Sequence, residues 1–228
     1  MNSWTADMAD TFARCFIRED RYKLLISGIG VTIKVSIVAV ILGILIGFLI
    51  ALCNLSKNKF LRAIGKIYTD IIRGTPSVTQ LMIIYFVIFA SVDVSKTIVA
   101  ILAFGMNSSA YVAEIFRSGI MAVDNGQFEA GRSLGFNYRQ TMIYIIMPQA
   151  FKNVLPALGN EFIVLLKETS VAGYIALQDL TKGGDIIRSR TYDALMPLMA
   201  VAIIYLVMVM IFSKLVSMLE RRLRNSDH

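Results

Sequence analysis

Long uncharged, apolar runs alternate with polar segments along most of the chain. Val35–Cys53 and Ala194–Ser213 hold 19 and 20 uncharged residues, and about 20 apolar residues are enough to cross a bilayer as a helix. Three further runs are interrupted by charged residues but keep a helical repeat of apolar positions. The pattern predicts an all-α membrane protein with five transmembrane helices, at about 24–53, 61–90, 96–122, 153–177 and 194–213.

The second of these runs contains a proline. Its apolar repeat begins near Ile64, before the uncharged stretch starts at Gly74, and passes through Pro76. Proline kinks a helix and removes a backbone donor, which leaves the carbonyl of Ile72 to find another partner. We expect one long helix over about 61–90, affected at Pro76, whose first turns protrude from the bilayer.

The residues before the first span, 1–23, predict an extracytoplasmic helix on the membrane surface. Apolar side chains recur there at every fourth position, at Trp4, Met8, Phe12 and Phe16, as in an interfacial amphipathic helix. A partly ordered polar tail with scattered aromatic residues is the alternative. The segment is not typical of a secretory signal, because its first positive charge is Arg14.

A polar segment of about 30 residues, 123–151, separates the third and fourth predicted spans. Asp124 is placed to cap a helix with Gln127 as the reciprocal partner, and Gly135 suits a left-handed helix end. These signals predict a short helix at about Gly126–Leu134. Such a helix is either an interfacial linker or a rigid element that docks in a groove of a partner protein.

Composition supports a membrane protein and excludes several soluble classes. Hydrophobic residues make up 56% of the chain and charged residues 17%, whereas soluble domains contain about 45–50% and about 25%. These shares argue against a disordered chain, a coiled coil or a nucleic-acid-binding domain, despite a net charge of +7. Basic loops at an anionic membrane surface account for the positive excess.

The basic residues near the span ends indicate how the chain crosses the membrane. Four lie in each of the segments 57–66, 117–152 and 214–224, which share one side, and eight lie on the other side. Cytoplasmic loops carry the excess of Lys and Arg. This distribution therefore favours an N-terminus outside and a C-terminal tail, 223–228, in the cytoplasm.

The chain offers little for catalysis or metal binding. His228 is its single histidine, and Cys15 and Cys53 flank the first span. That span would hold the two sulfurs about 30 Å apart, which is too far for a disulfide. We therefore expect no catalytic residue and no metal site.

Segment 123–151 resembles the EAA motif of the inner-membrane permease subunits of ABC importers. The motif reads E-A-A, three residues, Gly, nine residues and then I-x-L-P. In this chain Glu129-Ala130-Gly131 is followed by Gly135 and, after nine more residues, by Ile145-Ile146-Met147-Pro148. The departures are Gly131 for the third motif residue, Ala, and Met147 for Leu.

The resemblance extends over nearly the whole chain to the branch of this family that carries polar amino acids, of the histidine, glutamine and arginine type. Its further marks, in chain order, are Gly28-x-x-x-Thr32, Arg73-Gly74-Thr75-Pro76, Ala110-Tyr111-x-Ala113-Glu114 with Arg117, Pro148-Gln149-Ala150 and Lys167-Glu168-Thr169-Ser170.

The resemblance implies an ATP-driven importer in the bacterial inner membrane. In that family two permease subunits, identical or paralogous, form the path, two cytoplasmic subunits use ATP and Mg, and an extracytoplasmic protein delivers the amino acid. No G-x-x-x-x-G-K-[ST] pattern occurs in this chain, so ATP chemistry falls to a partner and this chain is expected to bind no cofactor. The short cytoplasmic helix would couple the permease to an ATPase through Glu129, Ala130, Gly131, Arg132, Leu134 and Gly135.

Polar side chains inside the predicted spans point to a substrate path, since they are costly there unless they face a cavity or one another. Glu161 suits the ammonium of an amino acid, and Asn107 or Arg73 suits its carboxylate. Alternatively, Arg73 pairs with Asp70 and Glu161 braces the seam between two subunits. The predicted pathway residues are Glu161, Asn107, Asn160, Arg73 and Thr75, and the candidate gate comprises Lys167, Glu168 and Ser170.

Two rival functions stay open at the level of sequence. A secondary carrier would couple uptake to ions through Glu161, Glu114 or Asp70, and a non-transporting scaffold would use 123–151 only for docking. The pattern specifies neither the amino acid nor whether the second subunit is identical.

Overall fold

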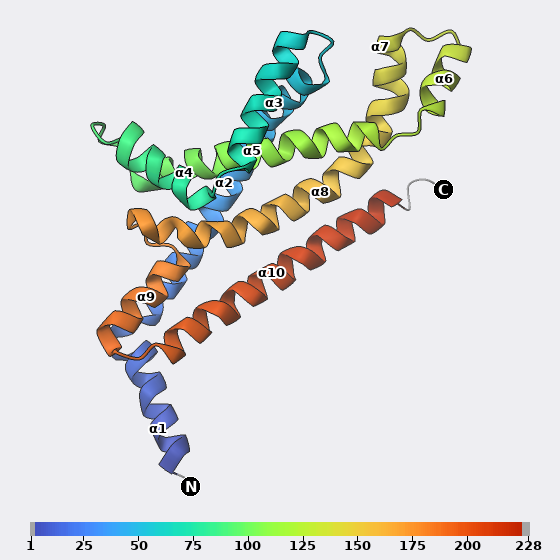
Figure 1. Ribbon diagram of the computed structural model, residues 1–228. Coiled ribbons are helices and arrows are strands. Elements are labelled where there is room, and N and C mark those ends of the chain that lie inside the picture. Colours follow the sequence, from blue (N-terminus) through green and yellow to red (C-terminus); the bar gives the residue numbers. More distant parts are fainter. Residues whose placement is uncertain (1–2, 225–228) are drawn as a thin grey trace. The chain divides into compact units, whose positions relative to one another are not determined.

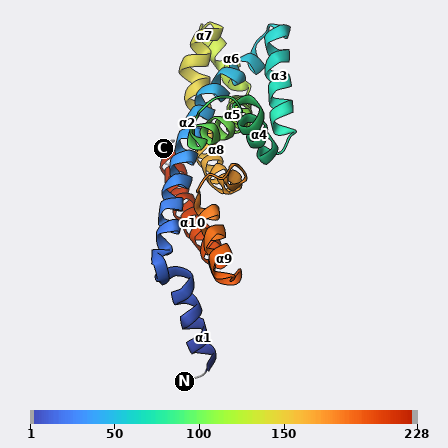
Figure 2. The ribbon, with the colours of Figure 1, turned by 90° about the vertical axis from the view of Figure 1, so that its left-hand side faces the viewer.

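The computed structural model describes residues 3–224, and every regular element in this range is helical (Figure 1 and Figure 2). This confirms the all-α prediction for the described part of the chain. The His228 end of the tail lies outside the described residues. The long helices are α2 (Tyr22–Leu55), α5 (Lys96–Met121), α8 (Met147–Glu168) and α10 (Leu195–Arg224). The shorter helices are α1 (Ser3–Phe12), α3 (Lys59–Arg73), α4 (Ser77–Ile83), α6 (Gly126–Ser133), α7 (Tyr138–Thr141) and α9 (Leu180–Thr191).

Three helices among the described residues are long and apolar enough to cross a membrane: α2, α5 and most of α10 (Leu195–Leu223). The count rises to four if α3 and the helical stretch Ser77–Ile88 together form one bent span. The predicted fourth span, α8, is not among them, because polar and charged residues such as Glu161 lower its mean hydropathy. The predicted number of five spans therefore stays a prediction.

The long helix expected over 61–90 is broken, which corrects that prediction. α3 ends at Arg73, and the N–H of Gly74 donates to the carbonyl of Asp70 at 2.9 Å. Pro76 is extended, with φ −64° and ψ 135°, and α4 begins at the next residue. The residue before a proline avoids helical geometry, so the break covers three residues where a kink was expected.

Contacts divide the chain into two compact units. Unit 1 comprises Met1–Val38, Pro76–Phe104 and Leu165–Ile211, and unit 2 comprises Ala39–Thr75, Gly105–Val164 and Phe212–His228. Each of the four long helices contributes residues to both units.

In unit 1, α9 packs against the start of α2, and glycines allow the close approach. A Cβ on Gly28 would lie 2.7 Å from the carbonyl oxygen of Asp179, and one on Gly183 would lie 2.7 Å from that of Leu24. The hydroxyl of Thr32 accepts a hydrogen bond from the N–H of Leu180 at 3.2 Å. The Gly28-x-x-x-Thr32 motif therefore seats the first turn of α9.

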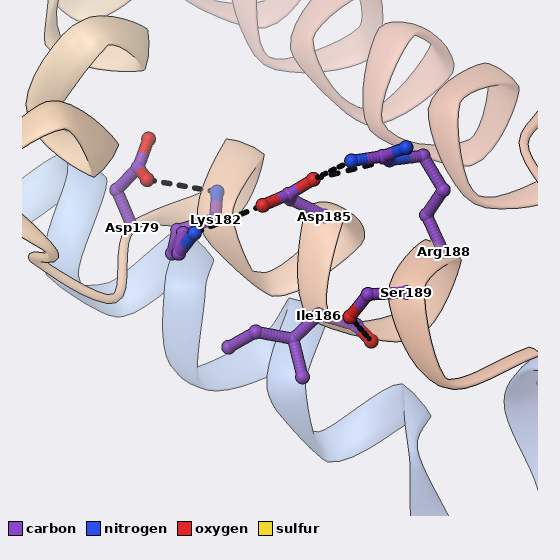
Figure 3. A network of polar contacts seen from close by, with 6 residues as sticks. All are labelled: Asp179, Lys182, Asp185, Ile186, Arg188 and Ser189. Atoms are coloured by element: carbon purple, nitrogen blue, oxygen red, sulfur yellow. Dashed lines mark hydrogen bonds and ion pairs between the residues drawn. The ribbon is translucent and has the colours of Figure 1, made fainter.

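The first turn of α9 is capped by a buried carboxylate. Asp179 accepts hydrogen bonds from the N–H groups of Thr181 and Lys182 at 3.2 and 2.9 Å. Further along the helix, Asp185 lies between Lys182 and Arg188, at 2.9 and 2.6 Å from their nitrogens (Figure 3). Local capping and ion pairing thus support a helix that the apolar pattern did not predict.

The N-terminal segment forms α1 and then two short helical turns, Ala13–Ile17 and Arg18–Asp20. Phe16, expected on a membrane-facing stripe, is buried, whereas Met8 and Phe12 are exposed. Cys15 is also buried and contacts Thr191 of α9, with its sulfur 3.8 Å from the threonine hydroxyl. Part of the predicted apolar stripe therefore packs on protein; the side chain of Trp4 lies outside the described residues.

In unit 2, α2 and α5 approach through small residues. A Cβ on Gly47 would lie 2.7 Å from the carbonyl oxygen of Ser109, and one on Gly43 would lie 3.0 Å from the side chain of Ser108. A core of Ala51, Val112, Ala113, Phe116 and Val154 lies beside this contact and joins these two helices to α8.

Candidate functional site

Three consecutive polar residues on α5 are buried in unit 2. Asn107 is 3% exposed, and Ser108 and Ser109 are fully buried. Successive residues of a helix point about 100° apart, and Ser108 and Ser109 accordingly contact different helices. Ser108 donates to the Glu161 carboxylate of α8 at 2.8 Å, and the hydroxyls of Ser109 and Tyr68 of α3 lie 2.6 Å apart.

The structure brings two predicted pathway residues to this polar cluster. Glu161 is 8% exposed and is held by Ser108, the residue next to Asn107. Asn160 precedes Glu161 on α8 but is exposed. Sequence reasoning missed Ser108 and Ser109, although an uninterrupted polar triplet within an apolar run was a signal that could have found them.

Arg73 lies at the end of α3 and contacts an aromatic ring of α5. Its guanidinium carbon is 5.4 Å from the ring centroid of Tyr111, a distance suited to a cation–π interaction. One turn further along α5, Glu114 forms an ion pair with Arg117. The hydroxyl of Thr75 donates to the carbonyl of Ile71 at 2.9 Å, at the end of α3.

The candidate gate residues belong to unit 1. Lys167 is exposed at the end of α8, and Glu168 and Ser170 are half-buried. Ser170 lines an open groove of 340 Å³ whose other walls include Tyr174 and Lys182.

The short helix of segment 123–151 forms as α6, Gly126–Ser133, close to the predicted bounds. Gly135 adopts the expected left-handed geometry, with φ 82°. The N-cap residue of α6 is Asn125, whose side chain makes no cap bond, and the Asp124 carboxylate just before it accepts from the N–H of Gly126 at 2.6 Å. The predicted reciprocal bond from Gln127 is wrong, because its side chain instead accepts from Gln149 at 3.2 Å.

A capping box does occur, but one helix later. At α7 the side chain of Asn137 accepts from the N–H of Gln140 at 3.0 Å, and the side chain of Gln140 accepts from the N–H of Asn137 at 2.9 Å. α6 and α7 lie side by side in both views (Figure 1 and Figure 2). The two helices thus form a hairpin in which a side-chain oxygen accepts from a backbone N–H at the start of each helix.

Gly131 explains how the hairpin closes. A Cβ on this residue would lie 2.6 Å from the Cγ2 of Thr141 in α7. The ring of Phe128 stacks on that of Tyr138, with centroids 6.3 Å apart. The remaining predicted coupling residues are exposed, namely Glu129, Ala130, Arg132, Leu134 and Gly135.

The described helices thus hold buried polar side chains within apolar, membrane-length segments, and they present a separate exposed hairpin. That combination defines an integral membrane protein with an internal polar site. No group of three or more His, Cys, Asp or Glu side chains within residues 3–224 is placed to hold a metal ion.

Comparison with known proteins assigns the family. Residues 43–225 match the family described as binding-protein-dependent transport system inner membrane component. This chain belongs to that family, and the resemblance drawn from its motifs is thereby confirmed.

Among curated relatives, the putative glutamine transport system permease protein GlnP of Rickettsia bellii is 40% identical over 87% of this chain and 92% of the relative. The arginine transport system permease protein ArtQ of Bacillus subtilis is 38% identical over 89% of this chain and 94% of the relative. Both matches cover nearly all of each chain.

Among solved structures, an amino acid ABC transporter determined with histidines has a TM-score of 0.85 and 46% identity, covering 91% of this chain and 98% of that chain. The MetNI methionine ABC transporter in an inward-facing conformation has a TM-score of 0.76 at 19% identity, covering 88% and 96% of the two chains. The second match shows a shared fold.

Proposed function

We propose that this chain is the permease subunit of an ABC importer that moves a polar amino acid into the cytoplasm. The observation that carries the proposal is the near full-length similarity to an amino acid ABC transporter at 46% identity. Relatives named for glutamine and arginine transport support a polar substrate.

The proposed assembly divides the work among several proteins. Two permease subunits, identical or paralogous, form the path, and two cytoplasmic subunits bind and hydrolyse ATP with Mg. An extracytoplasmic protein delivers the amino acid. This chain supplies the path and carries out no catalysis itself.

The proposed topology has five spans in the bacterial inner membrane, with the N-terminus outside and the C-terminus in the cytoplasm. In this topology α3 and α4 cross together as a broken span, and α8 supplies the fourth. A contact in unit 2 supports placing two loops on one side: the Nζ of Lys57, between α2 and α3, is 5.8 Å from the ring centroid of Tyr138.

The α6–α7 hairpin is the proposed coupling element. Its exposed side would dock in an ATPase cleft through Glu129, Arg132 and Leu134. The approach at Gly131 joins α6 to α7, and a π-helical turn, Met142–Ile146, leads directly from α7 into α8. Motion of the docked helix can therefore reach Glu161 along one chain of packed helices.

The proposed pathway is centred on the buried polar cluster. The Glu161 carboxylate, oriented by Ser108, would take the substrate ammonium, and Asn107 and Arg73 would take its carboxylate. Asn160 and Thr75 would contribute along the path. Lys167, Glu168 and Ser170 stay candidates for a gate.

The test is ATP-dependent uptake by the complete importer in proteoliposomes. We expect Glu129→Lys to leave the subunit inserted but to lower uptake at least about tenfold, because one anchor residue often contributes about 2 kcal/mol to an interface. Arg139→Ala is the matched control, because Arg139 is exposed on α7 at a position where the motif specifies no residue.

Two results would contradict the proposal. Uptake that survives Glu129→Lys would exclude the docking role of α6. Uptake by this chain alone on an ion gradient, without ATPase or ATP, would instead support a secondary carrier.

A further inference from the structure

Two adjoining cavities in unit 2 form one groove that no part of the proposed function uses. The smaller, of 70 Å³, has only apolar residues in its walls. The larger, of 490 Å³, includes Asn125 and Tyr138 in its walls. The two share four lining residues, Leu52, Leu55, Ile120 and Met147.

The groove runs from membrane-length helices to the α6–α7 hairpin. Its apolar end lies among α2, α5 and α8, where the rings of Phe48 and Phe116 meet edge to face at 5.3 Å. Its walls are partly open, since Leu52 is 50% exposed. An open apolar surface on membrane-length helices is chemically suited to contact with lipid acyl chains.

The other end of the groove includes the polar residues Asn125 and Tyr138, and Lys57 lies beside Tyr138. Tyr138 is 63% exposed there, and the Lys57 ammonium lies 5.8 Å from its ring centroid. Asp124, which precedes α6, uses its carboxylate to accept a hydrogen bond from the N–H of Gly126 at 2.6 Å. An anionic group is the ligand whose charge is complementary to the Lys57 ammonium.

We propose that this groove binds an anionic phospholipid, with an acyl chain between Leu52 and Ile120 and the phosphate at Lys57. A peptide from a partner protein fits less well, because the apolar end offers no partner for its backbone N–H and C=O groups, and unpaired groups are costly there. An acyl chain has no such groups.

The lipid would touch the coupling hairpin. Phe128 and Tyr138 line the wide end of the groove and also stack on each other across α6 and α7. An acyl chain that fills the groove would pack against both rings. The content of anionic lipid would therefore influence the position of α6.

To test this, the purified full-length chain is delipidated in detergent and titrated separately with phosphatidylglycerol and with phosphatidylcholine. Native mass spectrometry counts the lipids bound to each chain. We expect one tightly bound phosphatidylglycerol and a preference over phosphatidylcholine of about fivefold, the effect of a single lysine near an anionic surface.

Three variants separate the contributions. Leu52→Trp and Ile120→Phe fill the groove from opposite walls and should lower the affinity for both lipids about tenfold, as loss of a buried acyl segment would. Lys57→Ala should abolish the preference but keep acyl binding. Leu45→Trp, exposed on α2 outside the groove, and Lys59→Ala should behave as wild type.

Equal binding of the two lipids by wild type would overturn the proposal, as would unchanged binding in both groove-filling variants. Loss of the bound lipid on assembly with the ATPase or a second permease subunit would also overturn it, because the groove would then be a protein interface.

Discussion

At the scale of single residues, Ser108 has the largest expected effect on the polar cluster. Its hydroxyl donates to Glu161 inside an apolar region, and removing a donor from a buried charged group costs about 1–3 kcal/mol.

We therefore expect Ser108→Ala to raise the KM for ATP-dependent uptake about tenfold. Ser118→Ala is the matched control, since Ser118 is exposed on the same helix and bonds only its own backbone turn, at Ile115. An unchanged KM in Ser108→Ala would remove Glu161 from the proposed substrate site.

Asp179 gives a second prediction, with a defined pH dependence. Burial raises the pKa of its carboxyl above the ordinary value, although the N–H groups of Lys182 and Thr181 favour the charged form. The folded state therefore holds the proton more tightly than the unfolded state, and the stability of α9 falls as pH rises through the folded-state pKa.

Hydrogen exchange of the α9 amides, measured across pH, tests this. Asp179→Asn keeps an acceptor without the charge, so its opening free energy should be flat with pH and at least equal to wild type at pH 7. Asp179→Ala should also be flat with pH and should lie about 1 kcal/mol below Asp179→Asn at every pH, because the cap is removed. If the opening free energy of the wild-type α9 amides rose with pH, the predicted direction of the pH dependence would be contradicted.

At the scale of elements, helix contacts in this protein depend on where glycine occurs. Gly28 and Gly183 each face a backbone carbonyl across the α2–α9 contact, whereas nothing lies within 4 Å of a Cβ on Gly30. A backbone atom cannot turn aside as a side chain does.

Gly28→Ala and Gly183→Ala should therefore each destabilise unit 1 by about 1–3 kcal/mol through overpacking. Gly30→Ala, on the same helix as Gly28, should stabilise it by about 0.5–1 kcal/mol, the ordinary helix preference for alanine. The three variants are compared by thermal unfolding in nanodiscs. If Gly28→Ala and Gly30→Ala changed the stability in the same direction, the close contact between Gly28 and the backbone before α9 would be refuted.

In the coupling hairpin, Gly131 of α6 and Thr141 of α7 are in contact, so a change at one can be compensated by a change at the other. Gly131 departs from the alanine of the family motif, and Thr141 fills the space that a Cβ would take. Gly131→Ala should loosen the hairpin by about 1–3 kcal/mol, and adding Thr141→Ala should recover most of that loss because the clashing atoms are gone.

Hydrogen exchange over residues 126–141 measures the stability of this hairpin in each variant. Additive effects of the two changes would mean that Gly131 and Thr141 do not contact each other in solution.

The apolar pattern predicted α5 and the capping signals predicted α6, both nearly to the residue, because the signals of these helices are local. α9 was missed because it is supported by the local Asp179 cap and ion pairs and by the distant residues Gly28 and Thr32, none of which appears in an apolar repeat. The reciprocal cap expected at Gln127 was wrong for a similar reason: Gln149, far along the chain, takes that side chain. Ser108 was missed because a hydroxyl shows its role only when its partner is placed.

At the scale of the whole molecule, the proposed topology predicts which loops a reagent can reach. In a chain with Cys15→Ala and Cys53→Ala, a membrane-impermeant maleimide should label Arg190→Cys in intact cells. Lys57→Cys and Arg139→Cys should react only after the cells are permeabilised, because both loops are cytoplasmic in the five-span arrangement.

Leu45→Cys, inside α2, is the control that should stay unlabelled in both conditions. Labelling of Lys57→Cys and Arg139→Cys from opposite sides would contradict both the topology and the contact between Lys57 and Tyr138.

The division into two units has a consequence for biosynthesis. Each unit is assembled from three stretches of chain, and each needs a stretch beyond residue 164 or 211 to be complete. A ribosome emits the N-terminal part first, yet no contiguous part of the sequence corresponds to either unit. Neither unit is complete until its third stretch has been synthesised, so the early helices enter the bilayer before their partners, and a chain cut short within α10 leaves unit 2 unfinished.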